Sequence, residues 1–489
     1  MAFLSQLSGG APIETHISLV FVGADTVWKL KKAVRLPFLD FTRIEDRHRF
    51  LSRELELNQR TAPDLYRDVV PLTRSPDGTL TLGGEGPAVD WVLRMAPVPG
   101  GDFLDVMAAA GALPDTLLDA VADAVAAFHG GLPPAQGARP PMREIALGNI
   151  ESARAAGLPD DRVTAWGDAM LTMITATQAW LDQRAAAGFV RRVHGDLHLG
   201  NLCLWHGQPV LFDALEFDES MGTIDLGYDL GFLLMDLEHC VKGDTGRAAA
   251  NRVLNRYVAR TGDAALVRGL PIFLSMRAMV LAHVRARRGH AEASLLYLDS
   301  ALAYLRPCPA MLVAIGGLPG TGKSTLARAL APRLGRAPGA LVLRSDEIRK
   351  RRAGAAPEDR LPLAAYSTAE STAVFTELGR MTQEALESGH TVIGDATFMN
   401  PAHRTIMERA AAAAGVPFTG LWLTAPLTAL EARVAARQGD ASDATVEVVR
   451  AAAADDPGPG SWISIDARES EMALLLATGT LRPHVPPCP

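Results

Sequence analysis

The segment GLPGTGKS at 317–324 constrains the fold of this chain more than any other stretch of its sequence. It fits the pattern G-x-x-x-x-G-K-[ST], with the apolar run MLVAI at 311–315 before it and a helical pattern after it. The glycines let backbone N–H groups turn inward around phosphate oxygens, and the N-terminus of the following helix adds its positive dipole. Lys323 can then reach the β- and γ-phosphates of a nucleotide, and the Ser324 hydroxyl can ligate Mg²⁺. The nucleotide-binding residues predicted here are Gly317, Gly320, Thr321, Gly322, Lys323, Ser324 and Thr325.

The residues around and after this segment predict a parallel sheet flanked by helices. Strand-like apolar runs alternate with helical stretches rich in Ala, Leu and Glu, which is the pattern of successive β-α-β units. Helical patterning before the segment ends at the breaker run RPCPA, so we expect a boundary at about 307, between domains 1–307 and 308–489. The strands expected in the second domain are MLVAI (311–315), ALVLRS (340–345), TVIGDA (391–396), FTGLWL (418–423) and SWISID (461–466).

Acidic residues follow two of these expected strands. In open parallel sheets ligands bind beyond the carboxyl ends of the strands, so Asp346 is expected near a phosphate acceptor, whose hydroxyl proton it would accept. Asp395 holds the corresponding position after the next strand and is expected in the Mg²⁺ shell. Arg433 and Arg437 are four residues apart, on one face of an expected helix, where they could close over the transferring phosphoryl group.

With these residues, the second domain resembles the P-loop kinases that include zeta toxins, gluconate kinases, chloramphenicol phosphotransferase and polynucleotide 5'-kinase domains. The resemblance covers most of 311–470 and is carried by GLPGTGKST, by the SD of RSDEIR and by GDATF. It implies that an acid matching Asp346 binds or deprotonates the acceptor hydroxyl.

A second set of phosphotransfer residues lies in the first domain, in VHGDLHLGN at 193–201. Asp196 and Asn201 are five residues apart, the spacing of H-R-D-L-x-x-x-N, in which the Asp positions the acceptor hydroxyl and the Asn binds a metal ion. An apolar stretch then leads to Asp213, where a second metal-binding acid is expected. We therefore predict Asp196 as the base and Asn201 and Asp213 as Mg²⁺ ligands.

The segment WKLKK near the N-terminus supplies candidates for a phosphate-binding lysine. Lys29 and Lys31 are two residues apart in an expected strand and therefore share a face, so either can reach the α- and β-phosphates. We favour Lys29, which directly follows Val27-Trp28, and expect Glu54, in a helical segment, to pair with this lysine.

These motifs give residues 15–300 a resemblance to the aminoglycoside-phosphotransferase and choline-kinase-like family, a branch of the protein-kinase fold. The resemblance implies a two-lobed α+β domain, with an N-lobe over about 1–90 and a C-lobe over about 101–307. A chain that joins the two modules resembles bifunctional proteins with two ATP-Mg²⁺ sites. Each site is then expected to phosphorylate a hydroxyl of a small molecule such as a sugar, an amino alcohol or a nucleoside.

Composition sets limits on partners and on location. The net charge of -7 provides no global basic field for nucleic acid, and no apolar run is long enough to span a membrane. Four scattered cysteines favour a reducing cytoplasm. Two alternatives remain: a polynucleotide 5'-hydroxyl kinase that grips phosphates through RKRRAG at 349–354, or one domain that senses nucleotide without catalysis. The sequence indicates neither the acceptor nor the oligomeric state.

Overall fold

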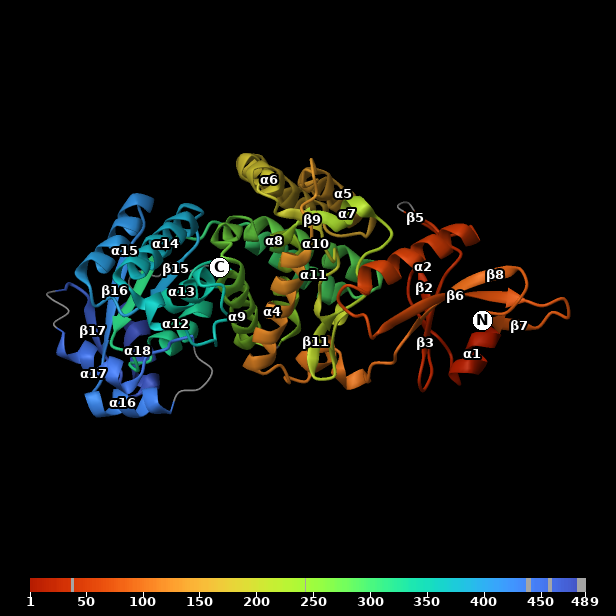
Figure 1. Ribbon diagram of the computed structural model, residues 1–489. Helices are drawn as coiled ribbons and strands as arrows, with labels where there is room; N and C mark the ends of the chain where they lie inside the picture. Colours follow the sequence, from red (N-terminus) through yellow and green to blue (C-terminus); the bar gives the residue numbers. More distant parts are fainter. Residues whose placement is uncertain (37–38, 242, 437–440, 456–459, 482–489) are drawn as a thin grey trace. The chain divides into compact units, whose positions relative to one another are not determined.

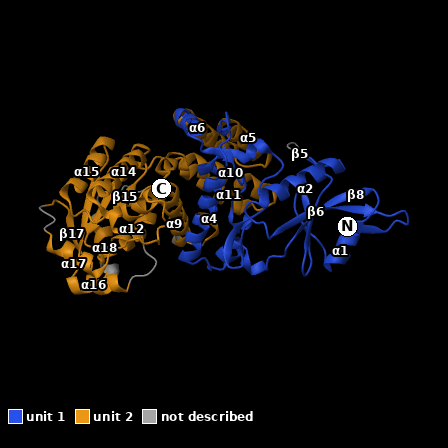
Figure 2. Cartoon of the chain, in the orientation of Figure 1, with its two compact units in different colours: residues 1–142, 178–236 blue, residues 143–177, 237–489 orange. Residues whose placement is uncertain are grey.

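The computed structural model describes residues 1–489 except 37–38, 242, 437–440, 456–459 and 482–489. The described chain forms two compact units (Figure 2). The first contains residues 1–142 and 178–236, and the second contains 143–177 and 237–489. The expected boundary at about 307 stays a prediction. Among the described residues, no helix combines the length and the apolar character that crossing a bilayer requires.

The first unit begins with a six-stranded antiparallel sheet in the order β1-β2-β3-β8-β6-β7 (Figure 1). Alternation along β8 sends Val92 into a core with Leu4 of α1, and Leu93 into a core with Leu51 of α2. The sheet therefore has a helix on each face. The elements are α1 (Ala2–Ser8), β1 (Ile13–Glu14), β2 (Ser18–Val22), β3 (Val27–Lys31), α2 (Ile44–Asn58), β6 (Tyr66–Arg74), β7 (Leu80–Leu82) and β8 (Ala88–Met95).

The rest of the first unit carries the segment that contains Asp196. This segment lies between two small antiparallel pairs, β9 with β12 and β10 with β11, and helices pack around it. The elements are α3 (Leu104–Ala109), α4 (Asp115–Gly131), β9 (Val190–Arg192), β10 (Leu202–Trp205), β11 (Gln208–Leu211), β12 (Thr223–Asp225) and α8 (Leu226–Cys240), whose last turn enters the second unit.

The second unit contains a five-stranded parallel sheet in the order β14-β15-β13-β16-β17. Every residue of β13 is buried, as expected for a central strand covered on both faces. Helices α12 and α18 pack on one face, and α14 and α15 contact the other. The strands are β13 (Leu312–Gly317), β14 (Leu341–Arg344), β15 (Val392–Asp395), β16 (Phe418–Thr424) and β17 (Ile463–Asp466). The helices are α12 (Lys323–Leu330), α13 (Ser345–Arg352), α14 (Thr368–Glu387), α15 (Pro401–Ala414), α16 (Leu427–Ala435), α17 (Val446–Ala454) and α18 (Ser470–Leu481).

Helices that precede this sheet belong to the same unit, and one of them, α9, contacts it. They are α5 (Met142–Ala155), the first part of α6 (Asp160–Ala186), α9 (Asp244–Thr261), α10 (Leu270–Arg287) and α11 (Ala291–Tyr304). Helix α9 lies along the edge strand β14, where the Val342 N–H donates to Asn255 Oδ1 at 2.6 Å. Asn251 Nδ2 donates to the Ala340 carbonyl at 3.0 Å. Two side-chain amides thus pair with backbone groups that an edge strand would otherwise expose.

The mixed α/β fold and the parallel sheet that the sequence predicts are confirmed. All five expected strands of the second domain form, with ends that differ by at most two residues. Helix α15 begins at Pro401, with Asn400 Oδ1 accepting the Ala402 N–H.

Candidate active sites

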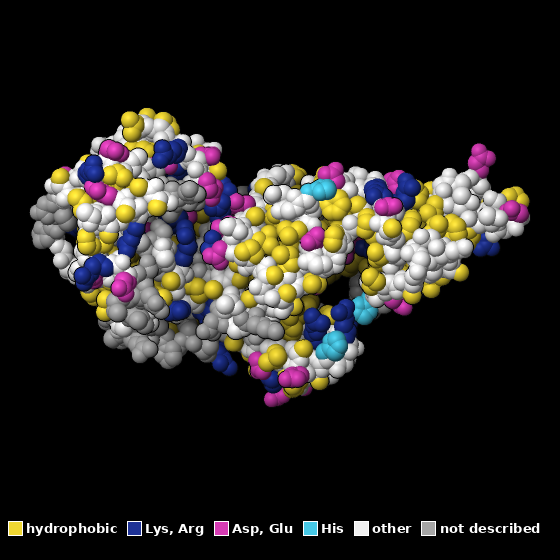
Figure 3. Space-filling model, turned by 90° about the horizontal axis from the view of Figure 1, so that it is seen from below, with side chains coloured by type: hydrophobic (Ala, Val, Ile, Leu, Met, Phe, Trp, Pro, Cys, Tyr) yellow, Lys and Arg dark blue, Asp and Glu magenta, His cyan; other side chains and the backbone are white. Residues whose placement is uncertain are grey.

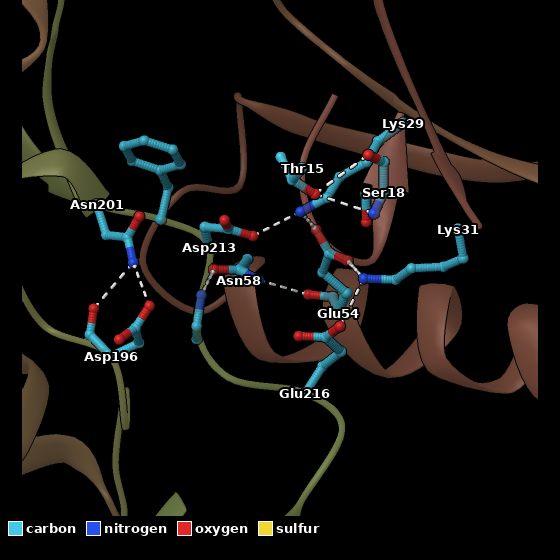
Figure 4. Close-up of polar contacts among 12 residues, drawn as sticks. Thr15, Ser18, Lys29, Lys31, Glu54, Asn58, Asp196, Asn201, Asp213 and Glu216 are labelled. Carbon is cyan, nitrogen blue, oxygen red and sulfur yellow. Dashed lines mark hydrogen bonds and ion pairs between the residues drawn. The ribbon is translucent and has the colours of Figure 1, made fainter. Parts of the chain in front are cut away.

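In the first unit, Lys29 and Lys31 both bind the carboxylate of Glu54 (Figure 4). The two lysines point to the α2 face of the sheet, and Leu30 between them points to the opposite core. Lys29 Nζ donates to Glu54 Oε1 at 2.6 Å, and Lys31 Nζ donates to Glu54 Oε2 at 2.7 Å. Lys31 Nζ also lies 2.5 Å from Glu216 Oε1. Strand alternation therefore delivers both candidate lysines to one buried acid.

Lys29 also reaches the predicted metal-binding acid, because its Nζ lies 2.6 Å from Asp213 Oδ1. The positive φ of 59° at Asp213 is held by the Tyr66 hydroxyl, which accepts the Asp213 N–H at 3.0 Å. Asn58 of α2 accepts the N–H of Ala214 at 2.9 Å. Desolvation favours the neutral carboxyl, but the Lys29 ammonium outweighs it and lowers the pKa of Asp213. Helix α2 thus positions both the lysine's partner and the Asp213 turn.

Asp196 and Asn201 lie together on the loop between β9 and β10 (Figure 4). Asn201 Nδ2 donates to the Asp196 carbonyl at 2.9 Å and to its Oδ2 at 3.0 Å. Asp229 of α8 stabilises this loop, because its carboxylate accepts the Gly195 N–H at 2.8 Å and the His194 N–H at 3.3 Å. The loop is therefore fixed by hydrogen bonds to its backbone.

The oxygen donors of Asn201 and Asp213 suit a hard divalent ion. Asn201 uses its amide nitrogen on Asp196, and its amide oxygen points away from that contact (Figure 4). Among the described residues, no three His, Cys, Asp or Glu side chains are arranged as a complete metal site, so phosphate oxygens or water would have to complete the shell. The donor set fits Mg²⁺ bound together with a nucleotide.

Glu216 belongs to the lysine-carboxylate cluster around Glu54, and the sequence interpretation missed it. Its side chain is 5% exposed, and that of its partner Lys31 is 1% exposed. The spacing of Lys29 and Lys31 indicates a shared face, but no local pattern indicates that the residue three positions after Asp213 meets Lys31. Residues 185 positions apart make this contact, and only the fold brings them together.

In the second unit, the predicted nucleotide loop connects β13 to α12 as expected. Gly317, Gly320 and Gly322 have φ of 136°, 87° and 89°, values that favour glycine. A Cβ on Gly317 would lie 2.5 Å from the Leu423 carbonyl oxygen. Lys323 Nζ donates to the carbonyl of Leu318 within the loop at 2.9 Å. The buried Thr321 hydroxyl also donates to the Leu318 carbonyl, at 2.8 Å. Ser324 is half-buried, and Thr325 is exposed.

Asp346 and Asp395 lie at the carboxyl end of the sheet, beside the loop. Asp346 is in the first turn of α13, directly after β14, and Asp395 is the register partner of Ile315 on β13. Arg344, which the sequence interpretation did not single out, binds Asp395 Oδ2 with its Nε at 3.2 Å. Its Nη1 binds Glu347 Oε1 at 2.9 Å. The carboxylate predicted to join the Mg²⁺ shell is thus paired with an arginine.

Arg433 binds the backbone beside the nucleotide loop. Its guanidinium donates to the carbonyls of Ala467 at 3.0 Å, Arg468 at 2.6 Å and Gly320 at 3.4 Å. This links α16 to the loop and to the segment after β17. Arg437 lies outside the described residues.

The basic run at 349–352 is engaged inside the unit. Lys350 is 1% exposed and binds both oxygens of Asp443 at 2.7 Å, and Arg352 pairs with Glu370. Arg351 donates to the Ala259 carbonyl, and Arg349 donates to that of Ala365. Over the described residues on the face in Figure 3, acidic side chains lie among the basic ones. All four cations of the run therefore have partners within the unit.

Comparisons with known proteins match two separate stretches of the chain to two family models. Residues 28–270 match the phosphotransferase enzyme family, and residues 312–455 match an AAA domain family. Among solved structures, the chain is similar to a choline/ethanolamine kinase family protein from Mesorhizobium loti (13% identity, TM-score 0.37, 63% of this chain and 95% of that one). It is also similar to a gluconokinase from Sinorhizobium meliloti (18% identity, TM-score 0.27, 37% and 95%).

The motifs and family matches define an enzyme of the kinase class, with a phosphotransferase-family region followed by a region that carries the P-loop motif. Over 463 residues the chain is 31% identical to the uncharacterized proteins Rv2004c of Mycobacterium tuberculosis and Mb2027c of Mycobacterium bovis. The alignment covers 90% of this chain and 89% of each relative. The chain belongs to the same family as these mycobacterial proteins.

Proposed function

We propose that the chain carries two separate ATP-Mg²⁺ sites, each of which transfers the γ-phosphoryl group to a hydroxyl of a small molecule. The observation that carries the proposal is the placement of Lys29, 2.6 Å from Glu54 and 2.6 Å from Asp213. A lysine held between a helix acid and a metal-binding acid is the arrangement that positions nucleotide phosphates in kinases. Bound Mg²⁺ would offset the charge that develops on the phosphate oxygens.

In the first unit, Asp196 is the proposed base. The acceptor hydroxyl oxygen forms a bond to the γ-phosphorus as the bond from that phosphorus to the β-γ bridging oxygen breaks. The hydroxyl proton passes to Asp196, and ADP leaves with the bridging oxygen. Asn201 fixes the Asp196 carboxylate by its 3.0 Å hydrogen bond and, with Asp213, offers oxygen to the metal ion. Lys29 would move from Asp213 to the phosphates when nucleotide binds.

In the second unit, the loop at 317–324 would hold the phosphates, and Asp346 is the proposed base. Lys323 would exchange the Leu318 carbonyl for a phosphate oxygen, and Ser324 would supply a hydroxyl to the metal ion. Arg433, bound to the Gly320 carbonyl, supports the loop from α16. Asp395 would join the metal shell only by sharing or releasing Arg344.

A small acceptor is favoured over a nucleic-acid strand. The alternative 5'-hydroxyl kinase would use the basic run at 349–352, but Lys350 is buried on Asp443 and Arg352 pairs with Glu370. Long polyanions bind through free cations, and charges already paired within the protein contribute little.

The test measures ADP release with a panel of sugars, amino alcohols and nucleosides, for the full chain and for Asp196→Asn and Asp346→Asn. Each variant is expected to lose turnover by about 10² to 10⁴-fold with one subset of acceptors and to retain it with the other. The exposed Asp168→Asn on α6 is the control. Equal turnover in all four proteins would reject the proposal. ATP binding without turnover at the 317–324 loop would instead support the nucleotide-sensing alternative for that region.

A further inference from the structure

A cavity of about 170 Å³ lies in the second unit, lined by no residue assigned to either phosphotransfer site. It is bounded by the end of α8, by α9, α10 and α11, and by the segment that follows α12. Three of its described lining side chains are arginines: Arg247 on α9, Arg306 after α11 and Arg336 after α12. The cavity is therefore walled by cations from three separate parts of the chain.

Two of these guanidinium groups have donors without acceptors. Arg247 Nη2 donates to the Gly335 carbonyl at 2.6 Å, and Arg336 Nη2 lies 3.5 Å from the Cys308 carbonyl. The Nε atoms of both are shielded from solvent and, among the described residues, have no hydrogen-bond partner. A buried charged donor left unpaired is costly, so the arrangement indicates an acceptor that the described residues do not supply.

Acidic side chains do not neutralise this cluster. Glu238 lines the cavity and accepts the Tyr304 hydroxyl at 2.6 Å, but it is a single carboxyl among three lining arginines. Neither Arg247 nor Arg336 forms an ion pair with any acid in the described part of the chain. The cavity therefore has a net positive lining. Pro271, Leu274 and Ala303 give it an apolar side.

We propose that this cavity binds a phosphorylated small molecule, with the phosphoryl group between Arg247 and Arg336 and the carbon part against Pro271 and Leu274. A phosphoryl group presents acceptor oxygens in several directions and so can satisfy two guanidinium groups from different elements, whereas one arginine fork satisfies a carboxylate. The bound group would join α9 to the segment that leaves α12, whose first residue is Lys323.

The test titrates the full chain with inorganic phosphate and with glycerol phosphate by calorimetry, in a Lys323→Ala background that weakens phosphate binding at the 317–324 loop. Arg247→Gln and Arg336→Gln are each expected to weaken binding at least about tenfold. Arg333→Gln is the matched control, because this exposed arginine lies three residues before Arg336 and does not line the cavity. Arg336→Lys keeps the charge but removes the Nε donor, and is expected to lose affinity as well.

Thermal unfolding without ligand shows which variants are folded, and the lysine variant provides a second measurement if a glutamine variant is unstable. Tighter binding of glycerol phosphate than of inorganic phosphate would support an organic ligand. Binding of glycerol alone, no binding of either anion, or equal losses in Arg333→Gln and Arg336→Gln would overturn the proposal.

Discussion

Lys31 and Glu216 meet at 2.5 Å in the interior of the first unit, and both side chains are almost fully buried. Lys31 also holds Glu54 at 2.7 Å, on the carboxylate oxygen that Lys29 does not use. Glu54 therefore binds the buried Lys31 through one oxygen and Lys29, whose side chain is 12% exposed, through the other. The two lysines, adjacent on one strand face, have different tasks.

Replacing each lysine by methionine should separate these tasks. Lys31→Met leaves Glu54 and Glu216 without a shared cation, and removal of one partner from a buried ion pair costs about 3–5 kcal/mol of unfolding free energy. Lys29→Met should cost less stability but should abolish turnover at the first site, because Lys29 is the lysine that reaches Asp213. Urea denaturation and ADP release measure the two effects. A Lys31→Met protein as stable as the parent would contradict the assignment.

Asp229→Asn should slow the first site without weakening nucleotide binding. The Asp229 carboxylate accepts the N–H groups of His194 and Gly195, just before Asp196, and an amide nitrogen in its place would face a donor. We expect kcat to fall about tenfold, with the KM for ATP unchanged, since one lost hydrogen bond to a charged group is worth roughly that factor. A proportional rise in KM would show that Asp229 supports binding instead. Asp168→Asn, on the exposed side of α6, should leave both constants unchanged.

Gly320→Ala should disrupt the nucleotide loop. The residue has a φ of 87°, and an added Cβ would lie 2.9 Å from the Leu430 carbonyl oxygen, so the backbone of the loop or of α16 has to move. We expect nucleotide affinity at the second site to fall at least about tenfold, because strain of 1–2 kcal/mol falls on the binding conformation. Gly148→Ala on α5, where a Cβ meets open space, is the matched control and should be neutral or slightly stabilising. Equilibrium titration with a fluorescent ATP analogue distinguishes the two.

His390 should make the second unit sensitive to acid. Burial, with a smaller contribution from Arg336, lowers the pKa of His390 to about 3, and its Nε2 contacts the Gly339 carbonyl at 3.0 Å. The unfolded chain binds a proton at the usual histidine pKa while the folded chain does not. Stability is therefore complete above about pH 6.5 and falls by up to about 1.4 kcal/mol per pH unit as the pH drops toward 3.

His390→Gln can still donate to Gly339 but does not titrate, so the acid limb of a plot of unfolding free energy against pH should become shallower. His290→Gln, at an exposed position, should leave that limb unchanged. Identical acid limbs for the parent and for His390→Gln would remove the assignment.

The sequence predicts the elements better than it predicts their partners. Short-range patterns place β13 and the nucleotide loop, because apolar periodicity and glycine spacing act within a few residues. The Lys29–Glu54 pair was also expected, since a kinase-like strand and helix imply it. Arg344 on Asp395 and Glu216 on Lys31 were not expected, because such pairs depend on strand register and on loop paths set by distant residues.

The basic run at 349–352 shows the same limit in the opposite direction. Four consecutive cations suggest a solvent-facing or polyanion-binding surface. Lys350 is nevertheless buried and pairs with Asp443, which is 93 residues away in the sequence. Local charge density does not indicate which cations are already neutralised by the fold.

The amide side chains of Asn251 and Asn255 have a consequence for how the chain can be divided. They hydrogen-bond the outer edge of β14 in place of a neighbouring strand. In a fragment that starts after residue 307, this edge would be exposed, and the Val342 N–H and the Ala340 carbonyl would lose these partners. An exposed edge strand of this kind can pair with the same strand of another molecule and cause aggregation. A stable fragment that contains the P-loop region should therefore also include the helices from residue 244 onward.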